Sequence, residues 1–551
     1  MGKFIGNRWV GLVFISMGIS LVIIDGTIVN TIFPSIIDAL KLTSTEVQWV
    51  QESYVLVFAS LLLVWGSLAD RFGRKLVLVL GIAIFVASSI WAGTSTDATS
   101  MIAARVVQGI GGSMVLPTTL SLVNANFQGK ERGIAFAVWG ATIGGMVALG
   151  PVLGGWLATS FGDDGWRLAF NVNLPIGLIV IAGLLYWVAE SKQEHREGGL
   201  DIVGALISIV MFLTLVFGLI EGRIYGWWEQ TDNAFQLGDF KWPTDGISII
   251  PVSLFLSVVF FTIFVFWERA RDRAHKNVLL DLRLFHIVSF RNGSIAALII
   301  SMGEFGLLFA IPLWLQNVDG LNALSSGLVL LWLAGGAFLA SGVGGALSGR
   351  VSPVTAVRVG VALEMVAVMG IAMGAATITG WQGIAGYLFI YGLGVGLATA
   401  QLTGVIMVDV PMDKIGQASG SQSTVRQIGS ALGIAVLGTT LFTSTQLAVS
   451  QNISDLSVFN TAPEAQVQVF ADSQAELVVD SAGAILPSMP AYLQSIGMPA
   501  DLATDVQMQA REGFTQGVKT TGWVAGGFLA LGLLSTFNLG TRRKKGEKVA
   551  K

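Results

Sequence analysis

The chain has 551 residues, of which 53% are hydrophobic and only 12% are charged, and its mean hydropathy is +0.71. Soluble domains carry charge on about a quarter of their residues, so this composition excludes a set of soluble domains. The absence of cysteine excludes disulfides, thiolate metal sites and thiol nucleophiles. The three histidines are scattered and form no ligand pair. A net charge of −3 indicates no particular partner. The composition predicts an all-α, polytopic integral membrane protein without a metal or cofactor.

Apolar runs of the length that crosses a bilayer, about 20 residues, occur fourteen times. An even number of spans places both chain ends on one side of the membrane. If both ends are cytoplasmic, the cytoplasmic segments hold 24 of the 32 Lys and Arg residues and the outer segments hold six, which is a strong positive-inside bias. The fourteen predicted transmembrane helices lie near residues 9–31, 46–68, 76–95, 101–123, 133–158, 170–189, 201–221, 247–267, 289–315, 326–348, 356–376, 382–408, 416–444 and 517–540.

The first two predicted spans each carry an acidic residue in their outer half. Asp25 lies about 16 residues into the first span, or roughly 24 Å at 1.5 Å per residue, and Glu52 lies at a similar depth in the second. A carboxylate in this position binds either a proton or a cation. Exchange of protons against a cationic substrate needs that competition. The alternatives are a buried structural hydrogen bond for Asp25 and a solvated interfacial position for Glu52.

A glycine-rich, basic loop follows the second predicted span. Gly66 and Gly73 allow two helices to approach closely and the chain to turn tightly. Asp70 suits the N-terminus of a neighbouring helix, where the helix dipole favours an anion. Three basic residues either take part in the contact between Asp70 and the neighbouring helix or only fix the orientation of the spans in the membrane. They are Arg71, Arg74 and Lys75.

A weaker copy of this loop begins at Gly345. Repetition between halves is typical of transporters, whose substrate site lies at the interface of the repeats. Gly349 occupies the position that corresponds to Asp70, so we expect the two loops to differ in function.

The repeat divides the chain into two pseudosymmetric six-helix halves, at 1–190 and 289–551. The linker at 191–288 contains the two inserted transmembrane helices. Within the C-terminal half, the polar, acidic stretch 445–516 has a helix-like pattern broken by prolines. It predicts an extracytoplasmic insert, which is a cap of short helices or, alternatively, a gate or a docking element. The basic tail 541–551 predicts an anchor to anionic lipids, with no role in nucleic-acid binding.

The fourth and fifth predicted spans carry an arginine and a run of glycines. Arg105 keeps its proton, so its role has to be electrostatic. It holds a nearby carboxylate ionised, or it forms a purely structural ion pair. In the fifth span, glycines four residues apart make a face for close packing, and a proline permits a bend. The residues singled out in this span are Gly150, Pro151, Gly154 and Gly155.

Three more ionisable residues interrupt the spans of the C-terminal half, namely Glu304, Glu364 and Arg426. Such a side chain costs about 2.5–3.5 kcal/mol on insertion scales, which makes each a candidate for proton or substrate binding. A structural pair is an equal alternative for Glu364. We expect Arg426 to pair with an acid across the two halves, and the alternative is a purely structural ion pair. With Asp25 and Glu52, four acids against two bases favour a cationic or neutral lipophilic substrate.

Four motifs resemble signature sequences of the major facilitator superfamily, and the first is typical of its fourteen-span drug:proton antiporter branch. They occur in the expected order, and the likeness covers nearly the whole chain, least of all the insert. The motifs are LVIIDGTIVNTIFP from Leu21, GSLADRFGRK from Gly66, ARVVQGIGG from Ala104 and GATIGGMVALGPVLGG from Gly140.

This resemblance implies a transporter that works by alternating access. It implies that Asp25 and Arg105 take part in proton transfer. It also implies that Asp70 locks the inner gate until the halves rock, and that the Gly150–Pro151 helix biases the protein toward export.

The sequence contains no ATP-binding motif, so the energy has to come from an ion gradient. We predict a monomeric proton-coupled exporter, an antiporter of lipophilic cationic or neutral drugs and biocides, and not an enzyme. It lies in the inner (cytoplasmic) membrane with both termini inside. The alternative is a dedicated exporter of a polyamine, an amino acid or a lipid. A membrane enzyme would need a nucleophile or a metal constellation, and a sensor would not need titrating acids in its spans.

Overall fold

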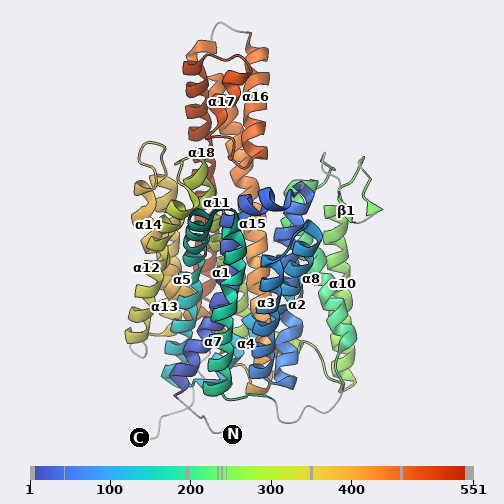
Figure 1. Ribbon diagram of the computed structural model, residues 1–551. Coiled ribbons are helices and arrows are strands. Elements are labelled where there is room, and N and C mark those ends of the chain that lie inside the picture. Colours follow the sequence, from blue (N-terminus) through green and yellow to red (C-terminus); the bar gives the residue numbers. More distant parts are fainter. Residues whose placement is uncertain are drawn as a thin grey trace.

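The computed structural model describes residues 7–42, 44–192, 199–231, 235–237, 240–243, 245–347, 351–459 and 463–539. Within these residues, fourteen helices are long and apolar enough to cross a membrane, which confirms the predicted number of spans. They stand side by side in a bundle with a helical projection at one end, which we call the hairpin end (Figure 1). Gly349 and the basic tail 541–551 lie outside the described residues.

The first group of helices occupies the predicted N-terminal half. Its sixth span is two helices, because the chain turns at Val172. Pro175 lies in the first turn after this break, where a backbone N–H has no intrahelical partner to lose. Asn173, the first residue of α7, is buried inside the bundle. The elements are α1 (Arg8–Leu40), α2 (Ser44–Phe72), α3 (Arg74–Gly93), α4 (Ala98–Asn126), α5 (Gly129–Phe161), the 3-10 turn η1 (Gly162–Asp164), α6 (Gly165–Asn171) and α7 (Asn173–Trp187).

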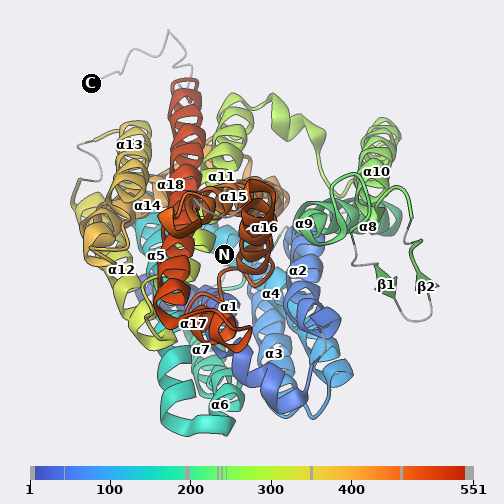
Figure 2. The same cartoon turned by 90° about the horizontal axis from the view of Figure 1, so that it is seen from above.

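An additional helix pair, α8 (Ile202–Ile220) and α10 (Ile249–Arg273), lies at the edge of the bundle, where α8 packs against α2 (Figure 2). The outer face of α10 exposes Phe255, Val258 and Phe266, an apolar surface that suits lipid acyl chains. The connecting segments contain α9 (Gly222–Tyr225), the antiparallel strands β1 (Gln236–Leu237) and β2 (Phe240–Lys241), and the 3-10 turn η2 (Leu282–His286).

The second group of helices occupies the predicted C-terminal half. In it, α15 packs against α11 and α18, and α14 packs against α12 and α13. The elements are α11 (Val288–Asn317), α12 (Ala323–Leu347), α13 (Pro353–Gly374), α14 (Gln382–Met407), the 3-10 turn η3 (Met412–Lys414), α15 (Ile415–Ser454) and α18 (Ala500–Thr536).

The helical projection is a continuation of α15 and α18, and not a separate loop. These helices have 40 and 37 residues, about twice the length that crosses a bilayer. Their extensions pack with η4 (Ser457–Phe459), α16 (Glu464–Asp480) and α17 (Met489–Ser495). The predicted boundaries of the 445–516 insert therefore fall inside α15 and α18, because the helical pattern continues past the apolar part.

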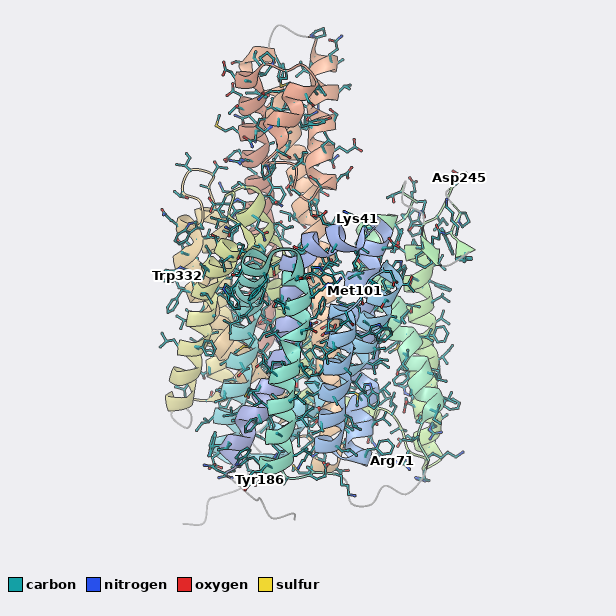
Figure 3. All side chains as sticks on the ribbon, viewed as in Figure 1. Lys41, Arg71, Met101, Tyr186, Asp245 and Trp332 are labelled. Carbon is teal, nitrogen blue, oxygen red and sulfur yellow. The ribbon has the colours of Figure 1, made fainter. Side chains whose placement is uncertain are left out.

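The direction of the chain identifies the other end of the bundle. Lys41, which caps the end of α1, lies near the hairpin end, whereas Arg71 of α2 and Tyr186 of α7 lie at the opposite end (Figure 3). The chain thus begins α1 at that opposite end, which we call the terminal end.

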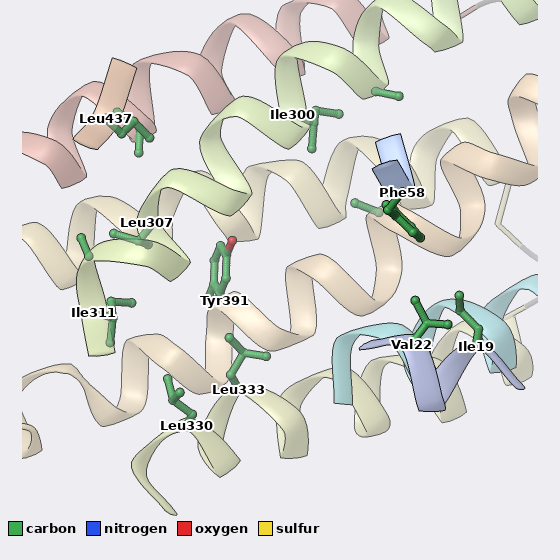
Figure 4. Packing of buried hydrophobic residues seen from close by; sticks show 14 of the residues in the cluster. Ile19, Val22, Phe58, Ile300, Leu307, Ile311, Leu330, Leu333, Tyr391 and Leu437 are labelled. Carbon is green, nitrogen blue, oxygen red and sulfur yellow. The ribbon is translucent and has the colours of Figure 1, made fainter. Parts of the chain in front are cut away.

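The two groups meet along four helix pairs among the described residues, namely α2 with α15, α4 with α15, α5 with α12 and α5 with α14. The largest buried apolar cluster extends across this boundary, since it includes Ile19 and Phe58 of the first group and Leu307 and Tyr391 of the second (Figure 4). The arrangement is compatible with two six-helix halves and a peripheral inserted pair.

Candidate functional site

The buried acid of α1 and the buried arginine of α4 form an ion pair. Arg105 Nη1 donates to Asp25 Oδ2 at 2.8 Å, and the two residues are 2% and 0% exposed. The structure thus joins two residues that the sequence singled out separately. Removing one partner from such a pair costs about 3–5 kcal/mol, because the other charge is left buried and unpaired.

Three neutral side chains complete this network, and none of them is among the predicted site residues. Gln108 Nε2 donates to Asp25 Oδ1 and to Ser89 Oγ, both at 2.8 Å, while Gln108 Oε1 accepts from Arg105 at 2.6 Å. Asn173 Nδ2 donates to the same Asp25 oxygen at 3.2 Å and to Ser89 at 3.1 Å. Gln108 belongs to the quoted motif of the fourth span. Asn173 stands in the sequence Asn-Val-Asn-Leu-Pro, and that pattern signals the helix break.

The guanidinium of Arg105 is held on its other sides as well. Its Nε donates to the Val50 carbonyl at 3.3 Å, and its Cζ lies 4.3 Å from the ring centroid of Tyr54, within the range of a cation–π contact. Together, the Asp25–Arg105 pair and its neutral partners connect α1, α2, α3, α4 and α7. A proton added to Asp25 therefore changes an interaction that several helices share.

Glu52 lies outside this network. It is half-buried on α2, and its Oε2 is buried without a hydrogen-bond partner. The structure therefore does not bring it together with Asp25, although the predicted depths were similar. Its role as a proton or substrate site stays a prediction.

A second ionisable cluster lies in the C-terminal group. Arg426 of α15 is 3.6 Å from Glu304 of α11, and Thr399 of α14 donates to the Glu304 carboxylate at 3.4 Å. Tyr391, also on α14, donates to the Glu304 carbonyl at 3.2 Å. The expectation that Arg426 pairs across the two halves was wrong, because α11 and α15 pack directly against each other in the same group.

Glu364 of α13 faces the same cluster. It is 0% exposed, it lies within electrostatic range of Glu304 and Arg426, and both of its carboxylate oxygens lack a hydrogen-bond partner. The predicted alternative of a structural pair is thus not what the structure contains. Among the described residues, no three His, Asp or Glu side chains gather as metal ligands.

Asp70 joins the two groups at the terminal end. Its Oδ1 and Oδ2 accept from the backbone N–H groups of Gly416 and Gln417, at 2.9 and 3.1 Å, at the N-terminus of α15, where the dipole favours an anion. Arg74 donates to Asp70 at 2.8 Å and to the Met412 carbonyl at 3.2 Å. Both residues are buried.

Gly66 allows this contact to form. A Cβ at that position would lie 2.6 Å from the Gly416 carbonyl oxygen and 2.7 Å from the Gly420 Cα. Both atoms belong to the backbone, so they cannot give way as a flexible side chain would. The α2–α15 crossing at the terminal end thus requires glycine on both helices.

The predicted loop is mostly helical, since α2 ends at Phe72 and α3 begins at Arg74, and its other residues contact the N-terminal group and the inserted pair. Gly73 has φ +117°, the left-handed region that glycine tolerates. The backbone N–H groups of Lys75 and Leu76 donate to the Glu190 carboxylate, and Lys75 Nζ donates to the Leu185 carbonyl at 2.8 Å. A gating role for Lys75 is therefore not supported by its contact, which ties α3 to α7. Arg71 lines a cavity between α2 and α8 together with Asp201.

The glycines of α5 face two different helices. Gly150 and Gly154 contact Thr27 and Thr31 of α1, whereas Gly155 packs on the backbone of Leu324 of α12. Across that contact, Gly327 of α12 packs on Pro151 and Val152 of α5. The motif thus packs α5 closely within its own group and across the boundary between the groups.

The linker after α10 reaches the α2–α15 crossing at the terminal end. Gln417 Oε1 accepts from the Asp281 N–H and Gln417 Nε2 donates to the Val278 carbonyl, both at 3.2 Å. The Asp281 carboxylate accepts from Arg283 at 2.9 Å and from Lys414. Burial alone would raise the pKa of Asp281, but the hydrogen bonds from Arg283 and Lys414 outweigh it and lower the pKa to about 2.

The family model of the Major Facilitator Superfamily matches residues 15–434. The chain belongs to this superfamily. Members of known structure share its fold: the human organic anion transporter MFSD10 (TETRAN) aligns with a TM-score of 0.54 at 14% identity, over 86% of this chain and 99% of its own. The proton:xylose symporter XylE aligns with a TM-score of 0.54 at 12% identity, over 86% and 95%.

Curated members of the superfamily are more similar in sequence. The tetracenomycin C resistance and export protein of Streptomyces glaucescens is 29% identical over 79% of this chain and 76% of its own. The multidrug resistance protein Stp of Mycobacterium tuberculosis is 31% identical over 78% and 75%. The multidrug efflux pump LfrA of Mycolicibacterium smegmatis is 28% identical over 94% of both chains, so the likeness to LfrA extends over most of the length of this superfamily member.

Proposed function

We propose that this superfamily member is a proton-coupled exporter of lipophilic cationic or neutral drugs, which works by alternating access. The observation that carries the proposal is the fully buried Asp25–Arg105 pair, an acid inside the membrane whose charge several helices share. The terminal end faces the cytoplasm of a cell bounded by an inner membrane, as the positive-inside bias indicates. The protein acts as a monomer and not as an enzyme.

Proton binding at Asp25 drives the conformational change. In the present arrangement Asp25 is a carboxylate whose oxygens accept from Arg105, Gln108 and Asn173. A proton on Oδ2 removes the charge that Arg105 faces, and Arg105 cannot release a proton of its own in exchange. A buried, unpaired guanidinium costs several kcal/mol. Arg105 therefore moves, and α1 and α4 move with it.

The gate at the terminal end completes the cycle. The Asp70 contacts to the α15 N-terminus hold the cytoplasmic side closed, and opening toward the cytoplasm breaks them. The α5–α12 contact keeps the groups together while α2 and α15 separate. Substrate enters from the cytoplasm when Asp70 is released, and it leaves when the contact forms again.

The relatives support drugs as the substrate class, because several of them are antibiotic-resistance and multidrug-efflux proteins. The excess of acids over bases in the spans supports a cationic or neutral molecule. A dedicated exporter of a polyamine, an amino acid or a lipid is the alternative that the experiment separates from this proposal.

Purified protein in liposomes with a fluorescent lipophilic cation tests the proposal. We expect the dye to accumulate in whichever compartment is made acidic, and a protonophore to abolish the accumulation. Dye movement that ignores the pH gradient would contradict proton coupling. If no dye moves, but a polyamine or a phospholipid raises the unfolding temperature and is transported, the narrow-substrate alternative replaces the proposal.

A further inference from the structure

The two buried ionisable clusters differ in their balance of charge. In the N-terminal group, the charge of Asp25 matches that of Arg105, so that pair is neutral without a proton. In the C-terminal group, Glu304 and Glu364 share a single arginine, Arg426. With both acids ionised, this cluster would keep one uncompensated negative charge away from water. Buried charge without a partner is avoided by neutralisation.

The geometry distinguishes the two acids. Glu304 has Arg426 at 3.6 Å and Thr399 at 3.4 Å, which stabilise its carboxylate. Glu364 is 0% exposed, and neither of its oxygens has a hydrogen-bond partner. Its side chain passes Gly394, where a Cβ would lie 2.6 Å from the Glu364 Cγ. The missing side chain at Gly394 leaves room for this buried acid.

The described parts of the surrounding helices bring no second cation to Glu364. The elements that face it contribute Glu304 from α11, Tyr391 from α14 and Arg426 from α15. α18 packs against α13 through Gly522 and Gly526, and its stretch 521–536 contains no ionisable residue. Neutrality of the cluster thus has to come from a proton.

A narrow cavity lies beside the cluster, on the side of Glu304 and Arg426. It is lined by Glu304, Arg426, Thr399, Thr403 and Gln422. Gln422 Oε1 is buried and has no hydrogen-bond partner, while its Nε2 donates to Thr403 at 3.1 Å. An unused acceptor beside an acid suits a water or a hydronium ion, which needs several polar partners.

We propose that Glu364 is a second proton-binding site, and that the Glu304–Glu364–Arg426 cluster holds one proton that is released and rebound in each transport cycle. The step is a carboxylate that takes up one proton to become a carboxylic acid and later returns that proton to water. Arg426 keeps its own proton and pairs with Glu304 while Glu364 is neutral. This proposal rests on the proposed proton-coupled export. It predicts two protons for each substrate molecule, one in each half.

The variant Glu364→Gln tests the proposal, because glutamine imitates a glutamic acid that keeps its proton. We expect the variant to fold and to transport with one proton fewer. With one proton instead of two for each substrate molecule, twice the pH difference is needed to balance the same substrate gradient. In liposomes with a fixed substrate gradient, we therefore expect the balancing pH difference of the variant to be twice that of the unmodified protein. Glu268→Gln is the matched control, since Glu268 is also buried, at 1% exposed, with an unpartnered Oε1, but lies in the inserted pair. An unchanged balance point in Glu364→Gln would overturn the proposal.

Infrared spectroscopy provides a second readout that needs no turnover. The unmodified protein should show a carboxylic-acid C=O band that disappears in Glu364→Gln. The same band should disappear in Glu304→Gln, since the remaining acid is then matched by Arg426. A spectrum that neither substitution changes would overturn the second site. If the unmodified protein moves dye without protons, the proposed function fails, whereas this infrared comparison still decides whether Glu364 holds a proton.

Discussion

At the residue scale, Asp25 is an ionisable group whose hydrogen-bond partners are all packed inside the bundle. Its two oxygens accept three hydrogen bonds, from Arg105, Gln108 and Asn173, and none of these partners is exposed to solvent. An acid in this setting cannot change its charge without a rearrangement of its neighbours. That coupling of charge to position is what a proton-driven transporter needs.

The variant Arg105→Lys keeps the charge but loses the shape of the guanidinium. An ammonium group cannot donate at once to Asp25, Gln108 and the Val50 carbonyl while it stacks on Tyr54. We expect gradient-driven dye transport to fall by about tenfold or more, given the cost of weakening a buried pair. Arg8→Lys is the control, since Arg8 forms an exposed pair with Glu131 that contributes little. Equal transport by both variants would contradict the role of Arg105.

The sequence could identify the charged members of the site but not its neutral ones. Asp25, Arg105, Glu304, Glu364 and Arg426 stand out because an ionisable group in a span is costly. Ser89 and Asn173 carry no such signal, since serine and asparagine are common at helix ends and in interiors. Only the meeting of α3 and α7 beside α1 gives them their role. The partner of Arg426 was mispredicted for the same reason, because pairing depends on helix packing.

At the element scale, the crossing of α2 and α15 is the gate that we propose. Asp70, Arg74 and the α15 N-terminus make its polar part, and Gly66 with Gly416 and Gly420 makes its close backbone contact. The polar contact of Asp70 and the steric requirement at Gly66 thus lie one turn apart on α2. The sequence pattern predicted both, although it did not show which basic residue takes part.

The variant Gly66→Ala should hold this gate partly open. Its Cβ would meet backbone atoms at 2.6–2.7 Å, and overpacking of this kind costs about 1–3 kcal/mol. The chain lacks cysteine, so spin labels attached through the substitutions Phe72→Cys and Met412→Cys, both at exposed positions, report the gate directly. We expect a longer distance between the labels in the variant. Gly527→Ala, where a Cβ meets nothing within 4 Å, is the control, and an equal distance in both would contradict the steric argument.

The variant Asp281→Asn should loosen the same gate from the linker side. The pKa of Asp281 is lowered from 3.8 to about 2, so its ion pair with Lys414 stabilises the fold above about pH 4. That stabilisation is lost only as the pH falls through about 2. We therefore expect the variant to increase gate opening equally at pH 5.5 and pH 8. An effect confined to one of these values, measured with the same spin labels, would contradict this pKa.

At the scale of the whole molecule, the number and order of the spans could be predicted from hydropathy and charge alone. The thickness of a membrane sets the length of each spanning helix, and cytoplasmic loops carry an excess of Lys and Arg. Both features are visible in the sequence. The helical projection was less predictable, because α15 and α18 continue past their apolar parts and polar helices lack a sharp boundary signal. The link between the inserted pair and the gate, through Gln417 and Asp281, is a tertiary contact that no local pattern indicates.

Taken as a whole, the molecule places one neutral ion pair in the N-terminal group and one acid-rich cluster in the C-terminal group, with the gate between them at the terminal end. The proposed cycle needs both groups to change their relative position when protons bind. In this proposed cycle, Asp25 couples the movement to the proton gradient.

The most direct test records proton flux and dye flux together in liposomes that contain a pH indicator. In the unmodified protein, every movement of dye should be accompanied by a movement of protons in the opposite direction. Asp25→Asn should lose the proton of the N-terminal group, so that at most one proton moves for each dye molecule, whereas Asp164→Asn, at an 83% exposed side chain of the same half, should leave the ratio unchanged. If Asp25→Asn moves as many protons for each dye molecule as the unmodified protein, Asp25 is not the coupling site.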